Sequence, residues 1–370
     1  MNKKLPDILF VASTDWDGLW FQRQELAQRF ALKGHRVFYF NRTLQRWPKF
    51  HHFRMRFVDP VMNKILSNPR PENLQVITPI WMPPINCLRF LNRRLIRRTF
   101  APLDIQSPVL ITDVPTYNTL DGIDFICPSK IVYLNVHNYD DCAWVLPEVI
   151  DSEKLLIQRA DVLFGDSAFH VERLKRISNG RKVFQSLPGV NYPKFRRAFR
   201  GDEAQRRTSI CFFGNIQSSI HLDLFGKMSA RYKVIFIGQV SDEIRNPIPE
   251  KIEIRPPVCL DELTHQLKEM DILGLFYRKN RFNRGVIPAK LFECMATRKP
   301  VLVCGLPEME YYQNAIYDFG GSEEEAVQII EDLPETETSG RLAKRDEIAR
   351  DADWSNRFKK FSDTIFSNGE

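Results

Sequence analysis

The chain has 370 residues, of which 43% are hydrophobic and 27% charged, so it has enough apolar material for packed cores and is neither disordered nor fibrous. A chain of this length predicts two domains of roughly 150–200 residues each. The formal net charge of +7 is unevenly distributed: residues 1–200 hold 30 Lys and Arg against 18 Asp and Glu, whereas residues 201–370 hold 23 against 28. The basic first half indicates an anionic partner.

The cysteines and the apolar segments indicate a protein of a reducing compartment. The seven cysteines are scattered, form no CxxC pair and have no histidine at zinc-ligand spacing, which argues against a disulfide framework and a structural metal. The apolar run at the amino terminus is too short for a signal peptide, and no uninterrupted apolar stretch is long enough to cross a bilayer. We therefore expect a cytoplasmic protein without a membrane span.

The first half alternates predicted strands and helices in the manner of a parallel sheet. A strand over 7–13, a helix over 20–32 and a strand over 37–40 follow one another at the spacing of a βαβ unit. Further elements are predicted downstream, with Ser167 as the cap of the last helix. They are strands over 109–112, 131–134, 162–164 and 182–186, and helices over 151–159 and 167–177.

A charged segment without hydrophobic period, residues 197–207, is predicted to link this half to a second doubly wound series. Strands are expected there over 209–213, 233–237, 251–254, 272–276 and 300–303, with helices over 222–230, 261–268 and 289–297. The amphipathic segment 354–366 is expected to form a last helix across the pair. The predicted domains are 1–200 with a basic insertion at 45–100, then 208–348, then a carboxyl-terminal helix within 350–370 that packs back on the amino-terminal domain.

Neither half carries a known phosphate-binding fingerprint. No GxGxxG follows the first strand of either half and no GxxxxGK[ST] is present, so dehydrogenase and P-loop functions are poorly supported. Ligands of doubly wound sheets bind at the carboxyl ends of the strands, so we expect the site in a cleft between the two halves.

Four sequence blocks follow one another over nearly the whole chain. They are WDGLW at 16–20 with GHRV at 34–37; Glu153 with ADV at 160–162 and LPGV at 187–190; Phe213-Gly214 with Ile237-Gly238; and 271–277 with IPAKLFE at 287–293 and RKPV at 298–301. In this order they resemble the GT-B glycosyltransferases of the family-4-like group (glycosyl transferases group 1 type). The resemblance implies an α/β fold of two facing Rossmann-like doubly wound domains, with a carboxyl-terminal helix that crosses back. It also implies an enzyme that moves a sugar from a nucleotide diphosphate sugar to a hydroxyl, with no cofactor beyond that substrate.

The resemblance places the nucleotide sugar on the second domain. Glu293 matches the family's ribose-binding glutamate, Lys290 lies one turn before it on the same helix face, and Pro288 suits the first turn. The predicted donor site is completed by Gly214, Asn215, Gly238, Tyr277, Arg278 and Arg284. The arginines of the 278–284 loop are predicted to counter the phosphate charge. The alternative is that Glu293 and Lys290 are solvated residues of a surface helix.

The chain departs from the family pattern at two places. Retaining members often carry two glutamates separated by seven residues, but the upstream position here is Gly285. The Arg and Lys pair that commonly grips the diphosphate is replaced, after Gly214, by Asn215-Ile216-Gln217. The stereochemical outcome therefore stays open. No DxD triplet lies near the donor block, so no metal is expected.

The resemblance places the catalytic face on the first domain. The strand over 131–134 runs into a polar loop in which His137 matches an Asp or His that faces the acceptor in related enzymes. An imidazole suits proton removal from a hydroxyl near neutral pH, and Asp140 and Asp141 are predicted to orient it or to serve as the base themselves. The alternative is a loop histidine bonded to backbone, with both aspartates solvated.

The loop over 15–20 follows the first strand and is expected to contact the acceptor. Asp15 and Asp17 are candidates to bind sugar hydroxyls, Trp16 to stack on a sugar face, and Gly18 to allow close approach of the backbone. The alternative is a helix-capping loop with Trp16 packed in the core.

Residues 46–98 form a basic stretch with eleven Lys and Arg against two acidic residues. Within it, arginines at 89, 93 and 97 recur beside leucines at 88, 91 and 95, a pattern typical of a helix that lies on an anionic bilayer. We therefore predict an enzyme of cell-surface polysaccharide synthesis, peripheral on the inner face of the cell membrane, with a lipid-linked or glycan acceptor.

The same basic segment is also consistent with an ordinary amphipathic helix that packs its apolar face on the sheet and turns its arginines to water. The fold fits a nucleotide-sugar epimerase as well as a transferase. Basic residues interleaved with aromatic ones also fit a nucleic-acid binder, but no known nucleic-acid module is visible, so no nucleic-acid partner is expected.

Overall fold

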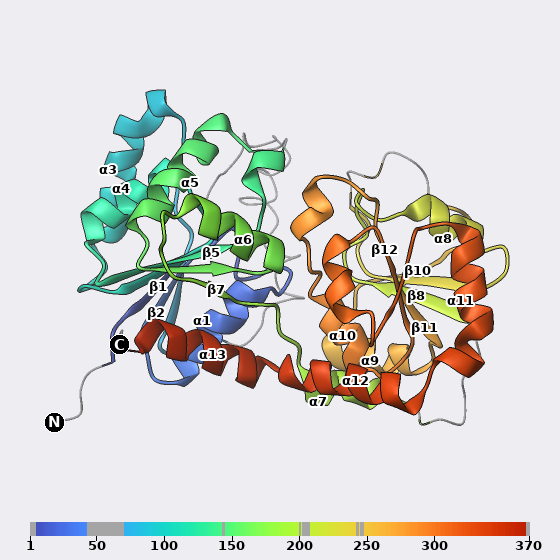
Figure 1. Ribbon diagram of the computed structural model, residues 1–370. Coiled ribbons are helices and arrows are strands. Elements are labelled where there is room, and N and C mark those ends of the chain that lie inside the picture. Colours follow the sequence, from blue (N-terminus) through green and yellow to red (C-terminus); the bar gives the residue numbers. More distant parts are fainter. Residues whose placement is uncertain are drawn as a thin grey trace. The chain divides into compact units, whose positions relative to one another are not determined.

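The computed structural model describes residues 5–42, 70–142, 145–199, 201, 208–241, 244 and 248–367. The chain divides into two compact units, one of residues 1–186 and 360–370 (unit 1) and one of residues 187–359 (unit 2) (Figure 1). Much of the predicted basic insertion, residues 43–69, lies outside the described residues.

The chain enters unit 2 upstream of the linker predicted at 197–207. The backbone N–H of Val190 donates to Ala352, and the N–H of Trp354 donates back to Val190, which ties the start of unit 2 to its last helices. Phe195 and Ala198 are buried in the core of unit 2. These contacts place residues 187–199 in the second unit, and of the predicted linker itself residues 200 and 202–207 lie outside the described part.

Unit 1 is built on a parallel sheet of seven strands in the order β3-β2-β1-β4-β5-β6-β7. The strands are β1 (Ile8–Val11), β2 (Val37–Phe40), β3 (Leu74–Ile77), β4 (Val109–Thr112), β5 (Lys130–Asn135), β6 (Val162–Gly165) and β7 (Val183–Gln185). The central strands are continuous apolar runs buried on both faces, as expected where helices cover both sides of a parallel sheet.

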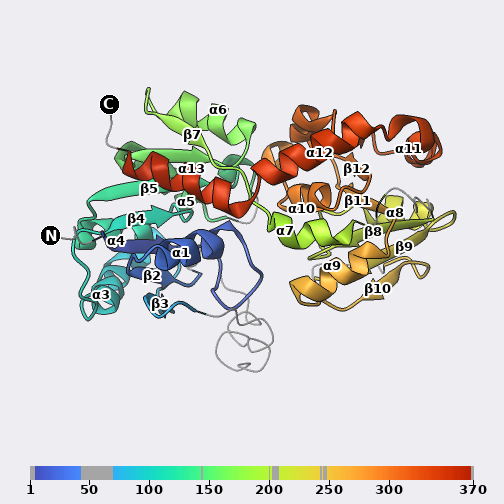
Figure 2. The ribbon, with the colours of Figure 1, turned by 90° about the horizontal axis from the view of Figure 1, so that it is seen from below.

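Helices cover both faces of this sheet (Figure 1). One face carries α3 (Arg89–Phe100), α4 (Tyr117–Ile126), α5 (Pro147–Arg159) and α6 (Ala168–Ile177). The other carries α1 (Gln22–Leu32) and the end of α13 (Trp354–Phe366), which run beside one another in Figure 2.

The carboxyl-terminal helix returns to unit 1, as the sequence predicted. The ring of Phe361 stacks on Phe164 at 4.6 Å between centroids, and Phe30 contacts both Phe361 and Phe366. The ammonium of Lys130 donates to the carbonyl of Ile365 at 2.5 Å, where cations are favoured at a helix end. Aromatic packing and this contact hold the last turns of α13 against the sheet.

Unit 2 is a second parallel sheet, of six strands in the order β10-β9-β8-β11-β12-β13. The strands are β8 (Ser209–Phe213), β9 (Lys233–Ile237), β10 (Glu253–Arg255), β11 (Ile272–Phe276), β12 (Val301–Cys304) and β13 (Tyr317–Phe319). The helices are α7 (Tyr192–Phe195), α8 (Leu222–Met228), α9 (Leu260–Lys268), α10 (Lys290–Ala296), α11 (Glu323–Thr336) and α12 (Ser339–Asp351). Its core contains a cluster of phenylalanine rings, in which Phe225 stacks on Phe276 at 4.3 Å.

Each sheet has one point at which the strand order reverses. In unit 1 it lies between β1 and β4, and in unit 2 between β8 and β11. Ligands of open α/β sheets bind beside the carboxyl ends of the strands at such a point. The carboxyl edge of each sheet, meaning the side on which its strands end, is therefore where a site is expected.

Candidate functional site

The reversal point of unit 1 holds a buried ion pair. Asp113 directly follows β4, and its carboxylate accepts hydrogen bonds from the backbone N–H and the hydroxyl of Ser13, at 2.9 and 2.5 Å. The guanidinium of Arg23, on α1, donates to the same carboxylate at 2.6 Å. Burial works against the charge of Arg23, but Asp113 outweighs it and raises the pKa of the guanidinium above its usual value. A fixed cation and carboxylate thus lie where a ligand is expected.

His137 lies next along this edge, in the loop that follows β5. The side-chain amide of Asn135 donates to the carbonyl of His137 at 3.1 Å and so fixes the backbone of the loop. Burial and the positive charge of Arg23 lower the pKa of His137 to about 4, although Asp166 and Asp113 oppose the shift. The imidazole is therefore neutral at neutral pH and is a weak base.

The two predicted partners of His137 have other partners. Asp140 accepts a hydrogen bond from Arg173 on α6 at 3.0 Å, and Asp141 accepts one from the side-chain amide of Asn138 at 2.7 Å. These contacts hold the shape of the loop. They do not support the predicted role of the two aspartates in orienting the imidazole.

A buried network behind this loop joins three elements. Arg173 and Glu153 form a bidentate pair between α6 and α5, at 3.0 and 2.6 Å, with both side chains almost fully buried. Glu153 also accepts from the hydroxyl of Tyr133 at 2.8 Å and from Asn135 at 3.0 Å, both on β5. The network fixes the strand end that carries the His137 loop.

Three buried acceptor atoms lie along the same edge without a partner among the described residues: Asn135 Oδ1, Asn138 Oδ1 and His170 Nε2. The amide nitrogens of both asparagines already donate, and His170 Nδ1 lies 2.6 Å from a carboxylate oxygen of Asp166. All three open atoms therefore accept hydrogen bonds. Unpaired buried polar atoms are uncommon in folded proteins, and a buried water molecule is a donor that fits them.

The loop after β1 is held in a way that changes the predicted role of Trp16. The side chain of Trp16 is fully buried and packs edge-on against Trp20 and Tyr39. It is therefore a core residue, and the predicted stacking on a sugar does not fit its position. Gln24 closes the loop by donating to the carbonyls of Asp15 and Leu19.

The other predicted acceptor residues of this loop are already engaged. Asp15 accepts from the backbone N–H of Arg42 at 3.0 Å, and Asp17 pairs with Arg70. A Cβ added at Gly18 would make only ordinary contact, with the Asp15 carbonyl at 3.5 Å, so nothing at this position requires glycine.

The carboxyl edge of unit 2 is lined by glycines. Gly214 follows β8 with φ +104°, and Gly238 follows β9 with φ +152°. A Cβ on Gly238 would lie 2.0 Å from the carbonyl oxygen of Gly214, so the two strand ends can approach only as bare backbone. A Cβ on Gly214 would lie 2.2 Å from Cε of Lys290, so the lysine side chain runs directly over this glycine.

Lys290 and Glu293 both lie on α10, half-buried at this edge. The ammonium of Lys290 is 5.6 Å from the centre of the Phe212 ring, and burial lowers the pKa of the lysine. Burial raises the pKa of Glu293 to about 7, although Lys290 opposes the shift. The alternative that the two are ordinary solvated helix residues does not fit these positions.

The other predicted donor residues differ in their accessibility. Tyr277 and Pro288 are buried, and Asn215 is half-buried. Arg278 is exposed and pairs with Asp223 at 2.8 Å, while Arg284 is exposed in the same loop. Asn283 donates to the carbonyl of Arg278 at 2.7 Å and shapes the loop between them.

Comparison with known proteins places this architecture. No protein-family model matches the chain. Over 97% of its length it superposes on sucrose-phosphate synthase from Thermosynechococcus elongatus, covering 98% of that chain with a TM-score of 0.68 and 10% identity. It also superposes on Anabaena HepE, solved in complex with UDP-glucose. That match covers 98% of this chain and the whole of HepE, with a TM-score of 0.68 and 11% identity. The chain has the GT-B fold.

The resemblance to GT-B glycosyltransferases inferred from the sequence is therefore confirmed in the fold. Among curated proteins, the chain is similar to TuaH of Bacillus subtilis (strain 168), provisionally named as a teichuronic acid biosynthesis glycosyltransferase. The two sequences are 26% identical over 235 aligned residues, which cover 58% of this chain. The matched part spans 59% of the length of that relative.

Five residues of the unit 1 edge were not predicted from the sequence: Arg23, Asp113, Asp166, His170 and Arg173. Asp113 directly follows the predicted strand 109–112, and Asp166 lies two residues after the predicted strand 162–164. Listing the polar residues after every predicted strand of a GT-B domain would have found both. Arg23, His170 and Arg173 are helix residues whose partners only the tertiary structure shows.

The basic helix predicted around arginines 89, 93 and 97 forms as α3, but its faces differ from the prediction. Arg89 and Arg93 turn toward α4, where both pair with the buried carboxylate of Asp121, at 2.8 and 3.0 Å. The buried residues of α3 are Asn92, Ile96 and Phe100 instead of the predicted leucines. Two of the three predicted arginines therefore contribute to packing against α4, whereas Arg97 is exposed, and the membrane role of this helix stays a prediction.

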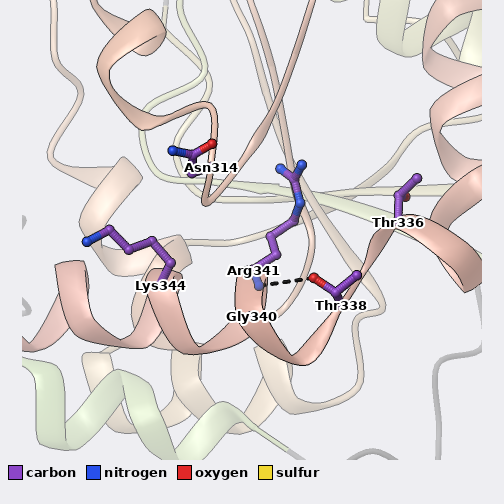
Figure 3. Close-up of a pocket in the computed structure, with 6 residues that line it drawn as sticks. All are labelled: Asn314, Thr336, Thr338, Gly340, Arg341 and Lys344. Carbon is purple, nitrogen blue, oxygen red and sulfur yellow. Dashed lines mark hydrogen bonds between the residues drawn. The ribbon is translucent and has the colours of Figure 1, made fainter.

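A separate hollow in unit 2 has a volume of about 440 Å³ and opens beside the first turn of α12 (Figure 3). It is lined by Asn314, Thr336, Thr338, Gly340, Arg341 and Lys344. Arg341 donates to the carbonyls of Gln313 and Ile316, and Lys344 pairs with Glu347. Both basic side chains that line the hollow are thus bonded to other groups of the protein, and we assign no function to the hollow.

Two further observations concern partners. In the part of the chain that the structure describes, no three His, Cys, Asp or Glu side chains gather so as to hold a metal ion. None of the described helices is both long and apolar enough to cross a membrane.

Proposed function

We propose that this protein is a glycosyltransferase that moves a sugar from a nucleotide diphosphate sugar, bound by unit 2, to a hydroxyl of an acceptor bound by unit 1. The observation that carries the proposal is the glycine-lined reversal point of unit 2, with Lys290 over Gly214 and Glu293 one turn further along α10. Bare backbone permits close approach of a diphosphate, a lysine supplies a counter-charge, and a carboxylate accepts ribose hydroxyls.

The comparisons support a uridine nucleotide as the first donor to test. The HepE structure, which shares the fold, is described as a complex with UDP-glucose, and the TuaH relative is named for teichuronic acid biosynthesis. Transfer to a lipid-linked or glycan acceptor is the matching proposal for this chain. The Asp113 and Arg23 pair lies at the reversal point of unit 1, where an acceptor is expected to bind.

The proposal is tested by thermal stabilisation with UDP, GDP, dTDP, CMP and NAD at millimolar concentration. A nucleotide present at about a hundred times its Kd stabilises the fold by roughly 2.7 kcal/mol, which is a visible rise in Tm. We expect one nucleoside diphosphate to give the rise and Glu293→Ala to remove it, whereas Glu335→Ala, an exposed glutamate on α11, keeps it. No shift with any nucleoside diphosphate, or a shift with NAD alone, contradicts the proposal. Conversion of a nucleotide sugar to its epimer without an acceptor would instead establish the epimerase alternative.

We also propose that unit 1 rests on an anionic membrane surface through the outward face of α3. Phe90 is 69% exposed and Leu91 43%, next to the exposed arginines 94 and 98. The preceding segment adds Ile80, 69% exposed, and Met82. Apolar side chains beside arginines suit the interface of a bilayer that contains anionic lipids.

The segment that carries Ile80 and Met82 is fastened to α3. The indole of Trp81 is buried and donates to Thr99 at 3.1 Å, and the N–H of Met82 donates to Asn92 at 2.8 Å. The apolar side chains on either side of Trp81 are thus held on the outside of the same helix. This arrangement replaces the predicted face built on arginines 89, 93 and 97.

Co-sedimentation with vesicles tests this surface. Binding to vesicles with phosphatidylserine is expected to weaken by about 1 kcal/mol for each of Arg94→Glu and Arg98→Glu, and to fall with added salt. Phe90→Ser is expected to weaken binding at all salt concentrations. Arg176→Glu, an exposed arginine of α6, is the matched control. Binding that the α3 variants leave unchanged, or that is absent in the wild type, contradicts the proposal.

A further inference from the structure

Two apolar side chains, Leu19 and Phe21, are exposed on the loop that joins β1 to α1. Leu19 is 43% exposed and Phe21 is 41% exposed, whereas Trp16 of the same loop is fully buried. The loop follows the carboxyl end of β1, one of the two strands at the reversal point of the unit 1 sheet. Ligands of open α/β sheets bind at such a point, so both side chains are accessible where a ligand is expected.

A buried glutamine holds the backbone of these two residues in place. Gln24 is fully buried, accepts the backbone N–H of Phe21 at 3.1 Å and donates to the carbonyl of Leu19 at 2.9 Å. Between them, the indole of Trp20 donates to Glu25 on α1 at 2.8 Å. The exposed ring is therefore carried on a fixed backbone, so little conformational entropy is lost when a ligand covers it.

The ring of Phe21 lies beside the ion pair of this edge. The guanidinium carbon of Arg23 is 6.0 Å from the centre of the ring. In the part of the chain that the structure describes, Arg23 donates to Asp113 through Nε, and its side chain is 12% exposed. The terminal amino groups of this guanidinium can therefore donate hydrogen bonds to a ligand that lies on the ring.

An aromatic ring beside a fixed cation suits a sugar. A pyranose ring has faces of C–H bonds and a rim of hydroxyl groups. The π face of phenylalanine is negative and attracts the C–H bonds, while guanidinium N–H groups donate to hydroxyl oxygens. An alkyl chain on the same surface would cover the guanidinium without a hydrogen bond, and covering a charge in that way is unfavourable.

We propose that the sugar ring of the acceptor stacks on Phe21, with Leu19 at its side, and that a hydroxyl of this sugar accepts a hydrogen bond from Arg23. This inference rests on the transferase function proposed above and identifies residues that bind the acceptor. Phe21 takes the role that the sequence predicted for Trp16, which packs in the core instead. Stacking fixes the orientation of the sugar, and orientation of a reacting hydroxyl contributes directly to rate.

The experiment measures transfer from UDP-glucose, or from the sugar nucleotide whose nucleoside diphosphate stabilises the protein. The acceptors are octyl and methyl glycosides of glucose, galactose and N-acetylglucosamine. Phe21→Ala is expected to raise the KM for the glycoside at least about tenfold, the effect common for truncation of an aromatic contact. The Kd for the nucleoside diphosphate should stay within about twofold, because unit 2 holds that ligand. Phe184→Ala, a 37% exposed phenylalanine of β7, is the matched control and should keep the wild-type KM.

Two further variants separate stacking on a sugar from packing on an alkyl chain. Phe21→Trp keeps an aromatic face and is expected to keep the KM within about threefold, whereas Phe21→Leu keeps apolar area alone and should lose as much as Phe21→Ala. A wild-type KM in Phe21→Leu would overturn the inference. A loss in Phe21→Ala that appears with octyl glycosides but not with methyl glycosides would overturn it too, because the ring would then contact the alkyl chain.

The remaining outcomes distinguish this inference from the function on which it rests. A wild-type KM in Phe21→Ala overturns the inference and leaves the transferase function intact. The same holds for a wild-type protein that binds a nucleoside diphosphate but transfers to none of the glycosides. A wild-type protein that binds no nucleoside diphosphate would overturn both.

Discussion

The two sheets end in edges of opposite character. At the edge of unit 1, charged side chains meet in buried pairs: Asp113 with Arg23, Glu153 with Arg173 and Asp166 with His170. At the edge of unit 2, glycines at 214 and 238 leave bare backbone, and a lysine and a glutamate lie beside them without strong partners in the contacts described. The first edge is built to hold directional groups in place, and the second to let a ligand come close to the backbone.

This difference matches the chemistry that each edge is proposed to perform. Buried ion pairs seldom add net stability, because desolvation offsets their attraction, but they fix geometry where both partners are present. Alignment of an acceptor hydroxyl with the sugar needs fixed geometry. A diphosphate instead needs space, a counter-charge and backbone donors, which glycines provide.

The largest expected effect is at the unit 1 edge. Glu153→Ala leaves the guanidinium of Arg173 buried and without its bidentate partner, and is expected to cost about 3–5 kcal/mol of unfolding free energy, measured with urea. The double variant Glu153→Met with Arg173→Met should recover much of that loss. A cost under about 1 kcal/mol for the single variant would contradict the fixed network.

At the unit 2 edge the corresponding test is a glycine. Gly238→Ala brings a Cβ within 2.0 Å of the Gly214 carbonyl, which is backbone and cannot move aside, so we expect a loss of about 2–4 kcal/mol. Gly180→Ala is the control, because Gly180 also has a positive φ but no atom within 4 Å of its added Cβ. The control should lose roughly 1 kcal/mol, from the backbone strain alone. Equal losses would show that the strand ends do not approach as described.

The pH dependence of stability should differ in sign between the edges. The pKa of Glu293 is raised to about 7 in the fold, so folded protein binds more protons than unfolded protein between its usual value and pH 7. The stabilisation from this group is present below pH 4.5 and is lost as the pH rises through 7. Glu293→Gln is therefore expected to be more stable than wild type at pH 8, by about 1–3 kcal/mol, and not at pH 4.5. Parallel pH profiles for the two proteins would refute this.

His137 should show the opposite trend. Its pKa is lowered to about 4, so the folded protein binds fewer protons than the unfolded chain between pH 4 and 6.5. Stability from the neutral imidazole is complete above pH 6.5 and is lost as the pH falls through 4. When the pH is lowered from 6.5 to 4, the unfolding free energy of His137→Gln should therefore fall by roughly 1–2 kcal/mol less than that of the wild type. Urea titrations at each pH measure this difference. A variant as acid-sensitive as the wild type would mean that the imidazole is not held neutral.

Much of the fold was predictable from apolar runs alone. Strands β2, β4, β8, β9 and β11 begin and end at the predicted residues, because buried parallel strands are short apolar segments bounded by polar ones. Elements with a weaker pattern were not predicted: β3, α4, β13, α11 and α12. β3 lies at the edge of its sheet next to a proline-rich segment, and α12 is polar around most of its surface.

The candidate site was predictable to a different extent at its two edges. Lys290 and Glu293 are neighbours on one helix, so local spacing suffices to bring them together. The unit 1 pairs join residues far apart in the chain, such as Arg23 with Asp113, and no local pattern contains that information. The same limit explains α3, whose helical spacing was visible in the sequence but whose faces depend on Asp121 of the next helix.

The central claim is that the two edges divide the work, with the nucleotide on unit 2 and the acceptor on unit 1. Calorimetric titration of UDP, or of the nucleoside diphosphate that stabilises the fold, into wild type, Glu293→Gln and Asp113→Asn tests it most directly. We predict that Glu293→Gln weakens binding at least tenfold, about 1.4 kcal/mol, while Asp113→Asn stays within about twofold of wild type. Wild-type affinity in Glu293→Gln together with a loss in Asp113→Asn would contradict the account.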